Sequence, residues 1–296
     1  MFESIARLVK DPPPEYIFEL SEAGLAFARR SAIGDPQQGF VPFPEETLVP
    51  SPVEDNIRRP ETIHAALVQV AGQAAPSKNL RRAALIVPDY AARVTVLDFD
   101  SFPSKAEEQL SLVRFRLKKT LPFDVESALV SYYVQAAKPA SGGKMEVVAA
   151  AMSLDVIARY EALLRNAGFH PGEVTTSSLA ALALHSNSGL SVVAKLAGRV
   201  LTAMVIQDDI LKLFRCVELE QADEEEVLLV VYPTLAYVED ELGTRVDRLV
   251  LCGFHSAALT GVTVPRASLI SSGSISGASE AGGWNAGLLG YLESAA

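Results

Sequence analysis

The sequence from Tyr16 to Ala28 reads YIFELSEAGLAFA, and a related pattern returns at residues 191–207, where SVVAKL and VLTAMVIQ flank Ala-Gly-Arg. In both places two apolar runs surround a short turn sequence, which is typical of a β-hairpin. Each hairpin is followed by strand and helix patterns, so the chain repeats one order of elements twice. The repeat predicts a two-lobed α/β architecture.

The composition excludes several classes of protein. Of the 296 residues, 49% are hydrophobic and 21% are charged, which is typical of a globular chain. A net charge of −10 argues against a nucleic-acid partner, because binding phosphates requires a basic surface. No run approaches the 18 apolar residues of a membrane span, and the N-terminus lacks the features of a signal peptide. We therefore expect a cytoplasmic protein.

The spacing of cysteines and histidines gives no metal site. Cys216 and Cys252 lie far apart, and the four histidines are scattered without a Cys-x-x-Cys pair. There is also no Gly-x-Ser-x-Gly elbow and no Walker A sequence. His255 follows a glycine, but a histidine without catalytic partners is better explained as a surface or hydrogen-bonded residue.

The hydrophobic periodicity predicts mixed strands and helices along the whole chain. The expected strands, besides the two hairpins, lie within 83–99, at 128–136, 145–152, 210–219 and 248–252. The expected helices lie at 2–9, 61–71, 104–119, 154–167 and 177–185, at about 223–242 with the acidic cluster 223–226 as its first turn, and near 292. Residues 29–60 and 271–283 are rich in Pro or in Ser and Gly, so they are expected to be loops.

The helix predicted at 104–119 has clear boundary signals. Ser104 and Glu107 form a capping-box pattern, and apolar residues then recur at helical spacing. Lys118 and Lys119 would lie in the last turn, where they complement the helix dipole. Pro122 would end the element before the next strand.

Three strings in this order resemble one family. They are RFRLKKTLPFDVESALVSYYV at 114–134, VVAAAMSLDVIARYEALLRNAGFHPGEVTTSSLAAL at 147–182, and TLAYVEDELGTRVDRLVLCGFHS at 234–256. Together they resemble the PilM branch of the actin-like ATPase superfamily, which includes FtsA, and the resemblance covers about residues 15–292. It implies a two-lobed, RNase H-like fold with an inserted small α+β subdomain.

The resemblance also implies domain boundaries and a partner. The first lobe would span 14–190, with the inserted subdomain at about 84–168, and the second lobe would span 191–292 after a short segment 1–13. Proteins of this family are cytoplasmic parts of the type IV pilus inner-membrane platform, and they hold the cytoplasmic tail of the membrane protein PilN. By this resemblance, Leu121, Pro122 and Phe123 would border the groove for that tail.

The family binds ATP with Mg²⁺ between its lobes, but this sequence departs from the family's phosphate-binding motifs. At the first loop, Glu19-Leu20-Ser21-Glu22-Ala23 replaces Asp-x-Gly followed by small hydroxyl residues, so two carboxylates would face phosphates. At the second loop, Lys195-Leu196-Ala197 lacks the carboxylate that would orient Mg²⁺. Only Gly253 and Ser256 remain from the third, so the sequence predicts a scaffold without ATP hydrolysis.

Two alternatives stay open. One is an active ATP-binding ATPase or kinase of the same fold. The other is a component of a type II secretion system that resembles the cytoplasmic part of GspL.

Overall fold

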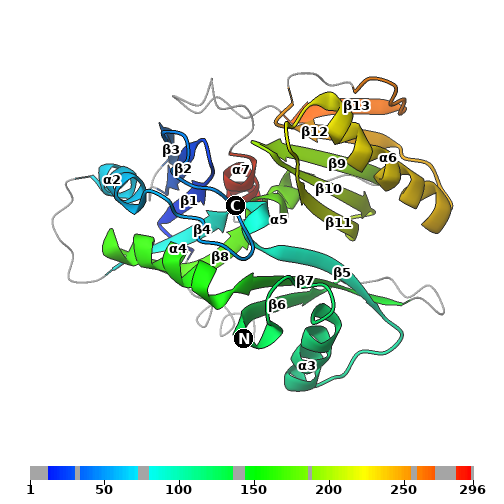
Figure 1. The fold of residues 1–296 in the computed structure, drawn as a ribbon, viewed down its shortest axis with the longest axis horizontal. Helices are drawn as coiled ribbons and strands as arrows, with labels where there is room; N and C mark the ends of the chain where they lie inside the picture. The colour runs from blue at the N-terminus through cyan, green and yellow to red at the C-terminus, as the bar shows by residue number, and fades with distance from the viewer. Residues whose placement is uncertain are drawn as a thin grey trace.

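The computed structural model describes residues 13–30, 34–72, 80–135, 144–185, 189–254, 259–270 and 285–294. Within these ranges the chain forms two five-stranded sheets and one three-stranded sheet. Figure 1 shows the two larger sheets next to each other, with the smaller sheet below them. The helix predicted at residues 2–9 and the loop predicted at 271–283 lie outside the described residues.

The two larger sheets repeat one topology. The first has the order β3-β2-β1-β4-β8, and the second has the order β11-β10-β9-β12-β13. In each sheet three consecutive strands pair antiparallel, and the first of them then pairs parallel with a later strand. The strands are β1 (Tyr16–Leu20), β2 (Gly24–Arg29), β3 (Gln37–Pro42), β4 (Arg81–Val87), β8 (Phe169–Thr176), β9 (Leu190–Ala197), β10 (Val200–Gln207), β11 (Ile210–Glu218), β12 (Arg248–Cys252) and β13 (Arg266–Ile270).

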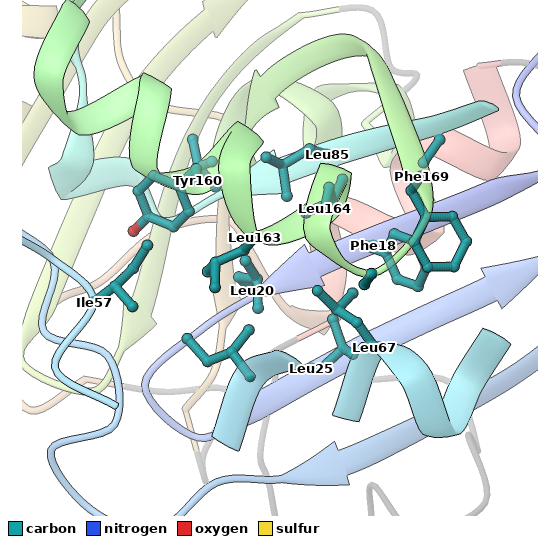
Figure 2. Close-up of a cluster of buried hydrophobic side chains, with 14 of the residues drawn as sticks. Phe18, Leu20, Leu25, Ile57, Leu67, Leu85, Tyr160, Leu163, Leu164 and Phe169 are labelled. Atoms are coloured by element: carbon teal, nitrogen blue, oxygen red, sulfur yellow. The ribbon is translucent and has the colours of Figure 1, made fainter. Parts of the chain in front are cut away.

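Helices cover both faces of the first sheet, which explains why every residue of β1 is buried. On one face, α2 (Pro60–Ala71) and α4 (Leu154–Asn166) pack over a core that contains Phe18, with Phe18 and Phe169 in edge contact at 4.8 Å. Figure 2 shows side chains of this core meeting between the strands and the helices. On the other face, Ile17 packs against α7 (Ala286–Ser294).

Helix α7 follows the second sheet in the sequence but lies against the first. Its side chains share a core with β1, β2 and β4, and it packs closely on the short helix α5 (Ser177–Ala181) and on the 3-10 turn η3 (Leu182–Leu184). The predicted second lobe, 191–292, included this helix together with the second sheet, whereas its observed contacts are with the first sheet. The domain boundaries themselves stay a prediction.

The inserted unit is a small sheet with one helix. The sheet has the order β5-β7-β6, and α3 packs on one of its faces over a separate core that includes Val113 and Leu117. Its elements are β5 (Arg93–Phe99), α3 (Ala106–Leu117), the 3-10 turn η2 (Val125–Ser127), β6 (Ala128–Val134) and β7 (Met145–Ser153). The opposite face contacts the second sheet through β5 and β11.

The predicted boundaries of α3 were wrong at both ends. The N-cap residue is Lys105, and no side chain forms a capping hydrogen bond at this end of the helix. Instead, the side-chain amide of Gln109 donates a hydrogen bond to the Pro103 carbonyl at 2.6 Å and fixes the start of the helix. The helix ends at Leu117, whose carbonyl accepts from the Thr120 backbone N–H at 2.8 Å. The helix therefore stops well before Pro122, and both lysines follow the last turn instead of lying in it.

The acidic cluster at 223–226 does begin α6 (Glu224–Glu241), as predicted. Asp223 accepts from the Glu226 backbone N–H at 2.9 Å, and the Glu226 carboxylate accepts from the backbone N–H groups of Gln221 and Ala222. Three strands, β3, β8 and β13, were not predicted from the sequence. β3 lies in a stretch predicted to be a loop, and β8 contains Pro171-Gly172, which is a turn signal.

Candidate functional site

The candidate site lies where the two larger sheets meet, and it contains three buried charged side chains. Glu19 is near the end of β1, Lys195 is near the end of β9, and Asp89 belongs to the 3-10 turn η1 (Asp89–Ala91) that follows β4. The carboxyl ends of parallel strands meet at one edge of a sheet, so this topology brings distant residues together. All three side chains are almost completely buried.

Lys195 and Asp89 form an ion pair that connects the two sheets. The Lys195 Nζ lies 2.9 Å from Asp89 Oδ2. Burial raises the pKa of Asp89, but Lys195 and hydrogen bonds from Ser178 outweigh it, so the pKa of Asp89 is lowered. Burial lowers the pKa of Lys195, but Asp89 and Glu19 raise it above its usual value. Both groups of the pair are therefore charged.

Asp89 has donors on both carboxylate oxygens. The Ser178 backbone N–H donates to Oδ1 at 2.7 Å, and the Ser178 hydroxyl donates to Oδ2 at 2.5 Å. The Thr202 hydroxyl donates to Oδ2 at 3.2 Å from the second sheet. Each oxygen of this buried carboxylate thus accepts at least one hydrogen bond, as a buried charge requires.

Glu19 completes the cluster and connects it to α7. Its carboxylate accepts from the Ser177 hydroxyl and, at 2.7 Å, from the Leu288 backbone N–H in the first turn of α7. Burial raises the pKa of Glu19 to about 7, although Lys195 and these hydrogen bonds lower it. The N-terminus of α7 thus occupies the position next to the first predicted phosphate loop.

The space between these residues is small. The cavity lined by Glu19, Ser21, Glu22, Asp89 and Lys195, among others, has a volume of about 20 Å³. A volume of this size is on the order of one water molecule. This cavity is therefore too small for a nucleotide.

The turn at the first predicted phosphate loop satisfies its own polar groups. The Ser21 hydroxyl donates to the Gly24 carbonyl at 3.0 Å and accepts from the Gly24 backbone N–H. A Cβ on Gly24 would lie 2.3 Å from the Val41 carbonyl oxygen, so this glycine is required by strand packing. Burial raises the pKa of Glu22, which faces Arg199 at the second predicted loop.

These residues do not match the requirements of ATP with Mg²⁺. A phosphate site needs open backbone N–H groups or free cations, whereas the Lys195 ammonium is paired with Asp89. Magnesium needs open oxygen ligands, whereas the oxygens of Asp89 and Glu19 already accept hydrogen bonds. In the part of the chain that the structure describes, no group of three His, Cys, Asp or Glu residues could hold a metal ion.

The third predicted loop is described only in part. Gly253 has φ 79°, a left-handed conformation that favours glycine, and it ends β12 without lining the cleft. The preceding residue, Cys252, is buried beside Ala181 and Ala286. Ser256 lies outside the described residues, so the proposed role of Gly253 and Ser256 in holding a nucleotide stays a prediction.

The predicted docking residues lie beside α3. Leu121 and Phe123 are half-buried in the small core under this helix, and Pro122 is exposed. The open grooves lie on the other face of the same sheet. One has a volume of about 170 Å³ and another about 390 Å³, and both are lined by β6 and by Leu179 of α5.

The residues of β6 that line the two grooves, and Asp89 in the cleft, were not predicted from the sequence as site residues. In β6, Leu129 and Tyr133 are exposed, while the alternate residues Val130 and Tyr132 face the core under α3. This period of two was visible in ALVSYYV, but which face is covered depends on tertiary packing. Asp89 follows the buried strand β4 after a single proline, Pro88, which was a signal for a polar group at the sheet edge.

Similarity to known proteins is found in the three-dimensional structure and not in the sequence. No protein-family model matches the chain, and no curated protein sequence matches it. Among solved structures, it is similar to a chain of a "PilM-PilN type IV pilus biogenesis complex", with 16% identity, a TM-score of 0.65, and coverage of 96% of this chain and 99% of that one.

A second similar structure is the cytoplasmic domain of EpsL, an inner-membrane component of the type II secretion system of Vibrio cholerae. It has 16% identity and a TM-score of 0.51, and the match covers 84% of this chain and 86% of that one. The resemblance to PilM noted in the sequence is thus confirmed for the fold, and the chain has the two-lobed fold of the actin-like ATPases.

Proposed function

We propose that this protein is a scaffold of a type IV pilus inner-membrane platform that holds the cytoplasmic tail of a PilN-like membrane protein and does not hydrolyse ATP. The observation that carries the proposal is the closed cleft. Where an ATPase of this fold would need phosphate-binding turns, this chain has a buried Lys195–Asp89 ion pair and a cavity of about 20 Å³. The similarity to a chain from a PilM–PilN complex supports the choice of partner.

The groove beside β6 is a suitable place for the tail. β6 is an edge strand of the inserted sheet, β8 is an edge strand of the first sheet, and both line the smaller groove. An extended peptide can pair with such an edge, while its alternate side chains enter apolar pockets. The groove offers Val87, Met152 and Ile157 as apolar walls. The wall predicted from sequence, Leu121 to Phe123, is the alternative position.

In this proposal the protein lies at the cytoplasmic face of the inner membrane and is held there by its partner. Among the described helices, none is long and apolar enough to cross a membrane.

The test is the binding of a synthetic peptide with the sequence of the cytoplasmic tail of a PilN-like membrane protein from the same organism, measured by fluorescence anisotropy. We expect saturable binding to the wild-type protein. Leu121→Asp and Phe123→Asp test the predicted wall, and circular dichroism checks that each variant is folded. Val53→Asp is a matched control, because Val53 is an exposed apolar residue that lines neither groove. Absence of binding to the wild-type protein would refute the proposal.

The alternative of an active ATPase is tested separately by calorimetry and thermal unfolding with Mg-ATP. Because the cleft has no open ligands, we expect no heat of binding and no change in Tm. A ligand present at about 100 times its Kd would stabilise the folded state by about 2.7 kcal/mol, an effect that is easy to detect. Micromolar binding of Mg-ATP would reopen this alternative.

The type II secretion alternative rests on the similarity to the EpsL domain. It is distinguished by the same anisotropy experiment with a second peptide, taken from the inner-membrane partner of a type II secretion system. Preference for that peptide would assign the protein to secretion instead of pilus assembly.

A further inference from the structure

A groove with a volume of about 530 Å³ lies where the inserted sheet meets the second sheet. Its walls come from β5, from β11, from η1 and from the end of α3, and Figure 1 shows β5 and β11 next to each other. None of its lining residues belongs to the cleft or to the two grooves beside β6. The proposed function therefore gives it no role. We call it the β11 groove.

The β11 groove follows the outer edge of a strand. β11 is an edge strand of the second sheet, and all six residues at 213–218 line the groove. Because alternate residues of a strand point to opposite faces of its sheet, Leu213 and Val217 pack with the core under α6. Phe214 and Cys216 pack instead towards the inserted sheet. A groove bordered by side chains from both faces must run along the edge between them, where the backbone groups of β11 have no strand partner among the described residues.

Two arginines make the β11 groove basic, although the chain has a net charge of −10. Arg93 and Arg215 line the groove, and neither forms an ion pair with a described residue. The Arg93 guanidinium lies 4.9 Å from the centre of the Tyr90 ring, a cation–π contact that holds it on the β5 side. The carboxylate in the lining, Glu218, is already paired with Arg199 at 2.7 Å. Both cations therefore lack a counter-charge in the described structure.

The rim of the β11 groove adds two exposed cations. Lys118 and Lys119 directly precede Thr120, which lines the groove, and neither lysine forms an ion pair within the described ranges. Cations alone would also suit a nucleic acid or an anionic membrane. A strand edge, however, is recognised by the backbone of another extended chain, which neither phosphodiesters nor lipid headgroups provide. The edge and the cations together therefore favour an acidic peptide.

We propose that the β11 groove binds an extended acidic segment of a partner protein, which adds a strand to the edge of β11 and places carboxylates on Arg93 and Arg215. Main-chain hydrogen bonds along the edge would supply affinity, and alternate side chains of the segment would supply specificity. Arginine binds carboxylates through paired, charge-assisted hydrogen bonds, which select an acidic sequence. The inference does not depend on the docking of a tail beside β6, because the two sites share no lining residue.

Fluorescence anisotropy of the full chain tests the proposal, with a labelled synthetic peptide of alternating glutamate and valine that is as long as the lined part of β11. In low salt we expect saturable binding to the wild-type protein, and added salt should weaken it. Arg215→Glu should lower the affinity at least about tenfold, because it replaces a charge-assisted hydrogen bond by repulsion. Arg245→Glu is the matched control, because Arg245 is exposed outside the groove and its reversal changes the net charge equally. Circular dichroism checks that both variants are folded.

Modified peptides separate strand pairing from the attraction of charge alone. The acidic peptide N-methylated at every backbone amide keeps its carboxylates but has no N–H donors, so it should bind at least about tenfold more weakly. The same peptide with lysine in place of glutamate should not bind. Absence of saturable binding to the wild-type protein would overturn the proposal, as would unchanged affinity in folded Arg215→Glu or equal binding of the N-methylated peptide. Tighter binding of a single-stranded oligonucleotide of similar charge would also overturn it, because the partner would then be a nucleic acid.

Discussion

The cleft between the two larger sheets and the grooved face of the inserted sheet differ in kind: the cleft buries charged side chains, whereas the grooved face exposes large hydrophobic ones. In the cleft, Glu19, Asp89 and Lys195 are buried, and each is matched by a charge or by hydrogen bonds. Along β6, Leu129 and Tyr133 are apolar and open to solvent. Buried charges are costly unless they are paired, and exposed apolar side chains contribute little to folding.

The difference separates stability from binding. In the cleft, Lys195 and Asp89 connect the two sheets, so changes there should lower the free energy of unfolding. The apolar residues along β6 have no such structural role, so changes there should affect partners and leave stability unchanged. The following experiments test this separation, beginning with the largest expected effect.

Replacing Lys195 with methionine should cause the largest loss of stability. Asp89 would remain buried with only neutral donors from Ser178 and Thr202. Removing one partner of a buried ion pair costs about 3–5 kcal/mol, because the other charge is left uncompensated. The free energy of unfolding in urea measures the loss.

The control for this change is Lys105→Met, which removes an exposed cation paired with Glu108 at 3.1 Å and should leave stability nearly unchanged. The double variant Lys195→Met/Asp89→Asn should recover part of the loss, because the Asp89 charge is then removed together with its partner. Equal stability of Lys195→Met and Lys105→Met would show that the pair does not hold the sheets together.

The protonation of Glu19 should make stability depend on pH. Burial raises the pKa of Glu19 from 4.5 to about 7, against the effects of Lys195 and of hydrogen bonds from Ser177 and Leu288. Between these pH values the folded state keeps a proton that the unfolded state has lost, so stability falls as pH rises. From pH 5 to pH 8 this contribution amounts to about 2–3 kcal/mol.

Glu19→Gln removes the titrating group and provides the comparison. The difference in unfolding free energy between the wild type and this variant should change by that amount between pH 5 and pH 8, with the variant favoured at the higher pH. Asp89, whose pKa is lowered, contributes in the opposite direction in both proteins, so it cancels from the difference. A difference that is independent of pH would mean that Glu19 is ionised throughout.

The sequence was sufficient to predict the repeated hairpins, because alternating apolar runs around short turns depend on local signals. It also singled out Glu19, Glu22 and Lys195 as residue types unsuited to phosphate binding, and Glu19 and Lys195 do lie together in the cleft, while the loss of nucleotide binding stays a prediction. It could not predict that Lys195 pairs with Asp89, because these residues are 106 positions apart and only the packing of two sheets brings them together.

Local signals misled the prediction where tertiary contacts prevailed. Ser104 matched a capping pattern, but the side chain of Gln109 fixes the start of α3 one residue later. Residues 169–176 contain Pro171 and Gly172, which predict a turn, yet parallel pairing with β4 makes them a strand. The close packing of α7 on the first sheet and on α5 requires Gly287 and Gly290, because a Cβ at either position would collide with neighbouring atoms. The sequence alone does not show which atoms these are.

Gly287→Ala should lower the free energy of unfolding, but by less than Lys195→Met. A Cβ at this position would lie 2.8 Å from Glu19 Oε1 and 2.9 Å from Ser177 Cα, so α7 would have to move. Forcing a methyl group into a packed site costs about 1–3 kcal/mol. Gly172→Ala is the matched control, because no atom lies within 4 Å of its added Cβ. Unfolding in urea should rank Gly287→Ala clearly below Gly172→Ala, and equal values would mean that α7 adjusts freely.

Leu129→Asp should have the smallest effect on stability and a large effect on binding. Leu129 is 49% exposed and lines the smaller groove, so the free energy of unfolding should change by no more than about 0.5 kcal/mol. If the tail of the PilN-like partner lies in this groove, a carboxylate there would be buried against apolar side chains, and the affinity for the tail peptide should fall at least about tenfold. Fluorescence anisotropy measures the affinity, with Val53→Asp as the control. Wild-type affinity in Leu129→Asp, together with lost binding in a folded Phe123→Asp variant, would move the docking site from the groove to the opposite side of the sheet, beside α3.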